Sequence, residues 1–174
     1  PSYKVHYVVS DYSIDSIDFM TSIGAESDGH ETMINISKSD YNMPQNLNVL
    51  EMNESHYQDF VVLHSSTYPA AYWTGDLLLE ETSTFRKFVV INNEELVGYS
   101  IVSDFGKPEE EIYFVYGKTI EIKLNLVATS LNSAFERCES VQLLLDVNEV
   151  KELHFFKEIG FRKKEVIITF SFQL

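Results

Sequence analysis

Short runs of apolar residues, separated by polar turns, occur along the whole chain. Apolar and polar residues that alternate with a period of two predict strands, and apolar residues that recur every three or four positions predict helices. The longest predicted helix covers 121–139, because Ile122, Leu126, Ala134 and Cys138 lie close to one stripe. The predicted strands are 5–9, 30–36, 47–52, 88–91, 96–102, 111–115, 141–147 and 165–172, and the predicted helices are 15–23, 54–65, 76–81, 121–139 and 150–159.

Turn and cap residues mark the ends of several of these elements. Gly24 follows the first predicted helix in the position that favours a left-handed C-terminal cap. Asn53 precedes the second as an N-cap, and Pro69 follows its end. Strands that alternate with helices, together with the hairpin over 88–102, predict an α/β fold with a mixed, mostly antiparallel sheet flanked by helices.

The chain contains an internal repeat with an offset of 136 positions. Gly24 falls on Gly160, and residues 5–9 fall on 141–145 without a gap. The helix before each glycine and the alternating strand after it match at the same offset. A strand, helix, glycine and strand unit therefore occurs twice.

The order of elements after residue 47 resembles the GNAT acyltransferase family. Residues 143–161, which end in Ile159-Gly160-Phe161, resemble the last strand and helix of that domain, and Leu96-Val97-Gly98-Tyr99 resembles its central hairpin. We expect a GNAT-like domain at 47–174, a linker at 39–46, and at 1–38 the C-terminal fragment of an upstream GNAT-like unit. Together they resemble the C-terminal part of a tandem GNAT protein.

The resemblance implies acetyl-CoA, or another acyl-CoA, as the donor and an amine as the acceptor. In this family a loop with the pattern Arg/Gln-x-x-Gly-x-Gly/Ala presents backbone amides to the pyrophosphate at the start of the long helix. Tyr116 stands here in place of the basic or amide residue, and Thr119 and Glu121 in place of the two glycines. A carboxylate would thus face the pyrophosphate, so we expect a degenerate cofactor loop. The loop consists of Val115, Tyr116, Gly117, Lys118, Thr119, Ile120 and Glu121.

The resemblance also implies a tyrosine on the last helix that protonates the leaving thiolate. That position is Phe156 here and Met20 in the first repeat, and neither side chain has a proton to give. Glu149, which falls where the family has Asn, is one remaining candidate for acid–base chemistry. His64 is the other, either as a base in the acceptor cleft or as a capping or surface residue.

Three aromatic residues follow His64 in the segment that lines the acceptor in the family. Tyr68, Tyr72 and Trp73 are candidates for an aromatic wall beside the acceptor, or for half-buried packing residues. Glu109-Glu110-Glu111 is expected to be the solvated edge of a loop.

The strong net negative charge of the chain limits the ligands and partners that we expect. The chain has 13 Lys and Arg against 27 Asp and Glu, a net charge of −14. This charge repels phosphate backbones, which argues against nucleic acid, and attracts a cationic amine or a basic peptide. Cys138 is the one cysteine, which fits a reducing compartment, and no apolar run reaches the roughly 18 residues that span a membrane. We therefore expect a cytoplasmic protein with no membrane partner.

Three functions fit these features. The first is an active N-acetyltransferase with an atypical site, and the second a non-catalytic GNAT-like half that supports an upstream half or a second copy of the chain. The third is a protein-interaction module with an exposed apolar patch near residues 68–79. The family-level expectation is acyl transfer, while the residues at the site favour the second function for this chain.

Overall fold

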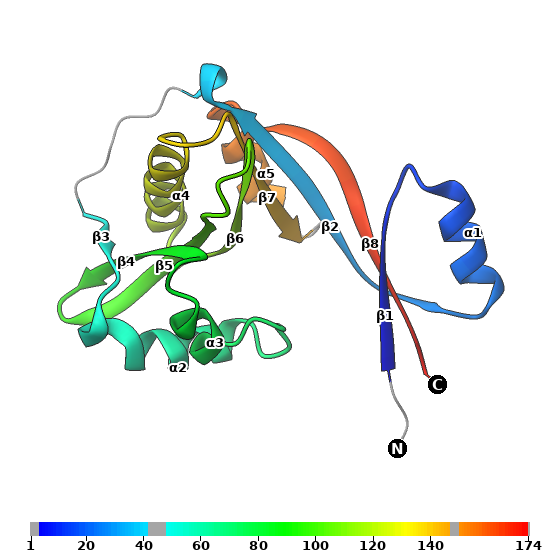
Figure 1. Ribbon diagram of the computed structural model, residues 1–174, viewed down its shortest axis with the longest axis horizontal. Coiled ribbons are helices and arrows are strands. Elements are labelled where there is room, and N and C mark those ends of the chain that lie inside the picture. The colour runs from blue at the N-terminus through cyan, green and yellow to red at the C-terminus, as the bar shows by residue number, and fades with distance from the viewer. Residues whose placement is uncertain (1–3, 42–47, 147–149, 174) are drawn as a thin grey trace. The chain divides into compact units, whose positions relative to one another are not determined.

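The computed structural model describes residues 4–41, 48–146 and 150–173. The chain forms two compact units: the terminal unit, Pro1–Ile36 with Leu143–Leu174, and the central unit, Ser37–Gln142. Helices and strands follow the predicted order, and the fold is α/β with mostly antiparallel strands flanked by helices (Figure 1). The domain bounds inferred from the sequence stay a prediction, and part of the linker at 39–46 lies outside the described residues.

The terminal unit holds both copies of the sequence repeat, except for Ser37 and residues 140–142, which belong to the central unit. Adding 136 to each bound of the first copy gives the corresponding bound of the second. Gly24 and Gly160 both have positive φ angles, 78° and 109°, which glycine adopts without strain. The first copy is β1 (Lys4–Ser10), α1 (Ile14–Ser22) and β2 (Glu26–Ser37), and the second is β7 (Ser140–Asp146), α5 (Val150–Glu158) and β8 (Arg162–Gln173).

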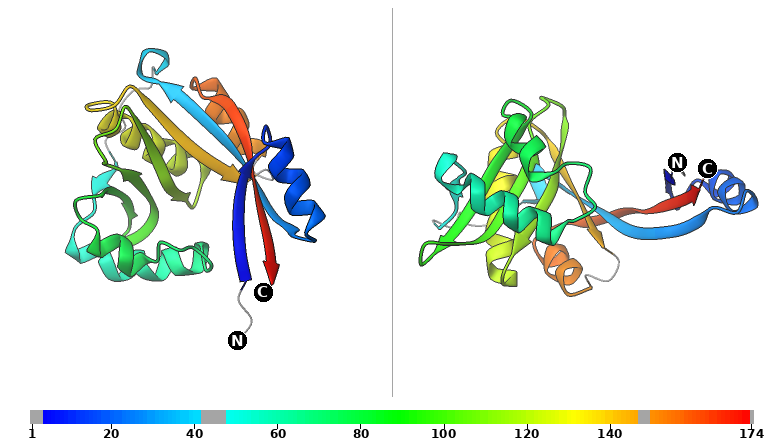
Figure 2. Two further views of the ribbon diagram at one scale, coloured as in Figure 1. Left: turned by 45° about the vertical axis from the view of Figure 1, so that its right-hand side comes forward. Right: turned by 90° about the horizontal axis from the view of Figure 1, so that it is seen from below.

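The two copies exchange strands. Within the terminal unit the strand order is β1-β8-β2-β7, so β8 of the second copy lies between β1 and β2 of the first (Figure 2). The β2–β8 register maps onto itself through the repeat: Ser27 lies opposite Phe170, and Ile34 lies opposite Lys163. The two copies are therefore related by an approximate two-fold axis.

The core beneath α1 is small. Val9 of β1, Met20 of α1 and Phe170 of β8 are its buried residues, so α1 lies over β1 and β8. Large apolar side chains nearby remain exposed, namely Tyr7, Val8, Tyr12, Ile14, Phe19 and Ile23.

The central unit is a sheet with a helix layer on each face. Its strand order is β6-β5-β4-β3, and each of these strands pairs antiparallel with its neighbour. The elements are the 3₁₀ turns Lys38–Asp40 and Glu54–His56, α2 (Tyr57–Thr67), α3 (Gly75–Glu80), α4 (Ile120–Ala134), β3 (Leu50–Glu51), β4 (Phe85–Asn92), β5 (Glu95–Ser103) and β6 (Glu109–Gly117).

Alternate residues of β5 contact the helices on the two opposite faces of the sheet. Tyr99 packs with Phe60 of α2 and Leu78 of α3 in the main core. On the opposite face, Ser100 makes a 2.8 Å hydrogen bond with Ser130 of α4. A single central strand thus holds α4 and the α2–α3 pair in place.

Several predicted bounds differ from the structure. The long helix ends at Ala134 rather than at 139, because the chain turns there, with the Arg137 amide donating to the Ala134 carbonyl at 2.9 Å. Within 48–52, the described part of the predicted strand 47–52, β3 covers Leu50 and Glu51. Glu110 is buried inside β6 rather than solvated, because Ser103 and the Lys107 amide donate hydrogen bonds to its carboxylate.

Candidate functional site

The predicted cofactor loop joins β6 to the start of α4. Thr119 has an extended backbone, and its hydroxyl accepts a hydrogen bond from the Ile122 amide at 3.3 Å. Its carbonyl accepts the first bond of the helix, from the Lys123 amide at 3.1 Å. The threonine at a family glycine position is therefore the N-cap of α4.

Close packing explains the glycine that this loop retains. A Cβ on Gly117 would lie 2.5 Å from the backbone nitrogen of Lys123, nearer than real side chains approach. The next residue is tied to β5, because the Lys118 amide donates to the Val97 carbonyl at 2.9 Å. Its ammonium group is paired with Glu95 at 3.1 Å. Lys118 thus points toward the hairpin turn, where it forms a solvent-exposed ion pair.

The start of α4 keeps some capacity for an anion. In an α-helix the first amides have no intrahelical partner, and within the described chain the Ile120 and Glu121 amides have none elsewhere. The helix dipole adds a partial positive charge there. Glu121 lies exposed in the same first turn and brings a full negative charge. The residues present therefore do not fit a pyrophosphate.

His64 is a core residue rather than a surface residue. It is 1% exposed, and its Nε2 lies 2.8 Å from the Trp73 carbonyl. Since a carbonyl only accepts, Nε2 carries the proton and Nδ1 accepts from the Tyr99 hydroxyl at 2.8 Å. Burial lowers the pKa of His64, which favours the neutral ring. Both nitrogens are engaged, so the expectation of a surface or capping histidine is wrong, and nothing in this geometry favours a base.

The three candidate aromatic residues do not form one wall. Tyr68 packs against His64 and Phe114, and its hydroxyl donates to the Val115 carbonyl at 3.3 Å. Trp73 is half-buried against Phe85. Tyr72 is 82% exposed, and its ring meets that of Trp73 edge-on with centroids 5.5 Å apart, so these two rings are in contact while Tyr68 packs elsewhere.

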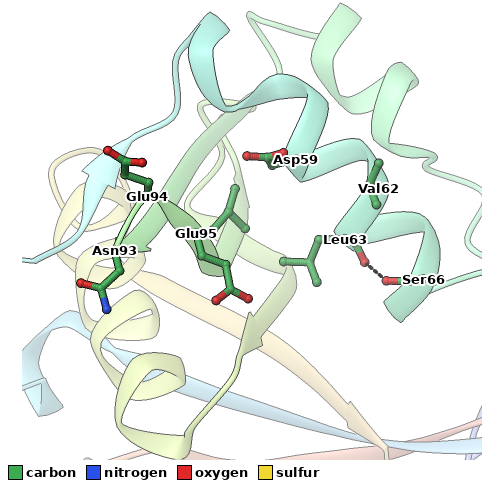
Figure 3. Close-up of a pocket in the computed structure, with 8 residues that line it drawn as sticks. Asp59, Val62, Leu63, Ser66, Asn93, Glu94 and Glu95 are labelled. Carbon is green, nitrogen blue, oxygen red and sulfur yellow. Dashed lines mark hydrogen bonds between the residues drawn. The ribbon is translucent and has the colours of Figure 1, made fainter.

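An acidic groove lies beside the hairpin turn, and it was not among the sites predicted from the sequence. Its volume is about 460 Å³ (Figure 3). Val62 and Leu63 supply an apolar wall from α2, and the acids come from both sides of the groove. The lining residues are Asp59, Val62, Leu63 and Ser66 of α2, Asn93 and Glu94 of the turn, and Glu95 and Leu96 of β5.

The turn residues carry a signal that sequence reasoning could have used. Asn93 and Glu94 have positive φ angles of 49° and 66°, as a two-residue hairpin turn of the mirror-image type requires. Glu94 and Glu95 of this segment line the groove together with residues of α2. Glu95 also binds Lys118, which connects the groove to the predicted cofactor loop.

The remaining predicted positions belong to the terminal unit or are not described. Phe156 is fully buried and packs against Phe161, with ring centroids 5.6 Å apart. Met20, its repeat equivalent, is also buried. Glu149 lies outside the described residues. Phe156 and Met20 therefore act as core residues.

The described residues contain neither a candidate metal site nor a candidate membrane span. No group of three or more His, Cys, Asp or Glu side chains there is placed to hold a metal ion. None of the described helices is both long and apolar enough to cross a membrane.

Comparison with known proteins identifies the fold. No family model and no curated protein matches the sequence. Among solved structures, a GCN5-related N-acetyltransferase from Sphaerobacter thermophilus superposes with a TM-score of 0.66 at 12% identity over 99% of this chain and 60% of that one. One from Kribbella flavida gives 0.68 at 10% identity over 95% and 67%. A tandem GNAT protein from the clavulanic acid biosynthesis pathway gives 0.71 at 10% identity over 99% and 64%. The chain has the GNAT fold and spans about two thirds of these solved chains or less.

Proposed function

We propose that this chain is a non-catalytic GNAT-like half, which supports acyl transfer from acyl-CoA to an amine by an upstream GNAT-like half. The observation that carries the proposal is Glu121 in the first turn of α4, where the fold would otherwise bind a pyrophosphate. Acetyl-CoA remains the family's cofactor and is not expected to bind here.

Electrostatics makes this substitution costly for a phosphate ligand. Two like charges about 4 Å apart repel by about 1 kcal/mol at the dielectric constant of water and about 4 kcal/mol at an effective value near 20. The nearby cation, Lys118, lies on an exposed side chain beside Glu95 and brings a second carboxylate close to the loop. The net charge of −14 adds to the repulsion.

The groups that would move protons also argue against chemistry in this chain. Phe156 cannot protonate a thiolate, and it is buried in the terminal unit. The neutral His64 ring is held at both nitrogens in the central core. We therefore assign the chain a supporting role at the active site of an upstream GNAT-like half.

An active N-acetyltransferase with an atypical site is the second candidate. The acidic groove favours it, because Asp59 and Glu94 would attract a cationic amine or a basic peptide while Val62 and Leu63 contact its apolar part. This candidate requires acetyl-CoA to bind despite Glu121.

Titration calorimetry of the folded chain with acetyl-CoA separates the two candidates. We expect no binding by the wild-type chain and weak binding by Glu121→Gln, since that change removes the repelling charge. Asp76→Asn, which removes a first-turn acid from α3 instead, is the matched control and should not bind. Micromolar binding by the wild-type chain would overturn the non-catalytic assignment and justify a screen of amine acceptors.

A further inference from the structure

The acidic groove of the central unit contains an apolar surface that faces water. Val62 of α2 is 60% exposed, although a helix ordinarily turns its apolar residues toward the core. Asp59 and Ser66, three positions before it and four after it, lie on the same face of the helix. Leu63 lines the groove beside Val62 and also packs against the main core, and the buried Leu96 of β5 completes the apolar lining (Figure 3). The outer face of α2 therefore offers apolar area to a partner.

Two acids border this apolar surface, and they come from different elements. Asp59 belongs to the first turn of α2 and Glu94 to the β4–β5 turn, and both are exposed. Neither forms an ion pair with any residue that the structure describes, and none of the eight residues lining the groove is basic. Glu95, the third acid of the lining, is paired with Lys118. Two carboxylates without a described counter-ion thus flank an apolar surface.

This combination favours a peptide segment over a small amine. A monoamine pairs with one carboxylate and leaves the other without a cation. A diamine reaches both acids but brings only a thin methylene chain to Val62. A basic peptide supplies two cationic side chains together with an apolar side chain between them, and the net charge of −14 attracts it. The groove volume of about 460 Å³ is that of a site for several groups rather than for one ammonium ion.

We propose that this groove docks a basic segment of another protein chain, in which two Lys or Arg side chains flank an apolar one. The cations pair with Asp59 and Glu94, and the apolar side chain packs against Val62 and Leu63. Docking leaves the segment chemically unchanged, so it requires neither acyl-CoA nor a base. The inference goes beyond the proposed function and holds whether or not the chain binds acyl-CoA.

Fluorescence anisotropy with the labelled peptide Lys-Leu-Lys-Lys-Leu-Lys tests the docking. The measurement is made at about 150 mM NaCl, where long-range attraction to the net charge is largely screened. The folded wild-type chain should bind the peptide saturably. Two control peptides, Glu-Leu-Glu-Glu-Leu-Glu and Lys-Ser-Lys-Lys-Ser-Lys, should bind about tenfold more weakly or not at all, because the first lacks the cations and the second the apolar side chains.

Variants of the groove locate the bound peptide. Asp59→Asn and Glu94→Gly each remove one carboxylate and should each weaken binding about three- to fivefold, and the double variant about tenfold. The turn tolerates Glu94→Gly, since glycine adopts a φ of 66° without strain and Asn-Gly is a favoured sequence for this turn. Asp76→Asn is the matched control, because it also removes a first-turn acid of a helix, one that does not line the groove, and it should leave binding unchanged. Circular dichroism checks that each variant folds.

Each other outcome overturns the proposal. No binding by the folded wild-type chain would refute docking of a basic segment. Equal binding by the wild-type chain and the double variant would show attraction to net charge alone. Spermidine that binds more tightly than the peptide, and loses affinity in the same variants, would assign the groove to a polyamine. Transfer of an acetyl group to the peptide on addition of acetyl-CoA, detected by mass spectrometry, would make the groove an acceptor site.

Discussion

Removal of one hydroxyl, by Tyr99→Phe, tests whether His64 is a structural residue. The Tyr99 hydroxyl donates to His64 Nδ1 at 2.8 Å, and both residues are essentially inaccessible to water. The other ring nitrogen is committed to the Trp73 carbonyl, so the ring cannot turn to find a new donor. The variant leaves a buried acceptor without a partner, which costs about 1–3 kcal/mol of unfolding free energy. The ring contact with Phe60, at 5.0 Å between centroids, is kept.

Urea unfolding at pH 7.5 measures this cost, and Tyr116→Phe supplies the control. Tyr116 packs beside Tyr99 with ring centroids 6.2 Å apart, and no hydrogen bond of its hydroxyl is found among the described residues. Its loss should change the unfolding free energy by less than about 0.5 kcal/mol. Equal, small effects of both variants would refute the assignment of the His64–Tyr99 pair as a stabilising core interaction.

Two further predictions concern pH and the cofactor loop. Burial lowers the pKa of His64 in the folded state, so its contribution to stability is present above the ordinary value of 6.5 and is lost as the pH falls through the folded-state pKa. Between pH 7.5 and 5 the wild-type chain should lose unfolding free energy in urea by up to about 1.4 kcal/mol more per pH unit than His64→Gln. Equal pH dependence of the unfolding free energy in the two proteins would contradict the buried neutral ring. Gly117→Ala places a Cβ 2.5 Å from the Lys123 nitrogen and should cost about 1–3 kcal/mol by urea unfolding, whereas Gly29→Ala, which meets no atom within 4 Å, should be nearly neutral. A neutral Gly117→Ala would show that the β6–α4 turn is not closely packed.

Local and periodic features were predictable from the sequence. The offset of 136 depends only on matching residues, and it reproduces the bounds of six elements. The place of the loop before α4 follows from a strand, a glycine and a helical stripe in order. The N-cap role of Thr119 was not predicted, although threonine is a common N-cap residue. Comparison with the family's glycine pattern treated Thr119 only as a lost glycine.

Features that depend on distant residues were not predictable. The burial of His64 requires Tyr99, which comes from a strand 35 positions later. The acidic groove requires the β4–β5 turn to lie beside α2, which only packing decides. Glu110 was predicted to be solvated because it lies in a run of three acids. Its burial depends on hydrogen bonds from Ser103 and the Lys107 amide, which the sequence does not show.

Because β8 pairs with both β1 and β2, the terminal unit cannot complete its sheet until the end of this sequence has been made. Lys4 pairs with Gln173, so nearly the whole chain separates two residues that must meet. During synthesis β1 and β2 leave the ribosome before β8 and have no strand between them until β8 emerges. Contacts this remote slow folding, because the closure of a long loop precedes any gain from pairing. The central unit is one continuous segment, so it can fold before β8 is made. Until then β1, an apolar strand, has no β8 to pair with.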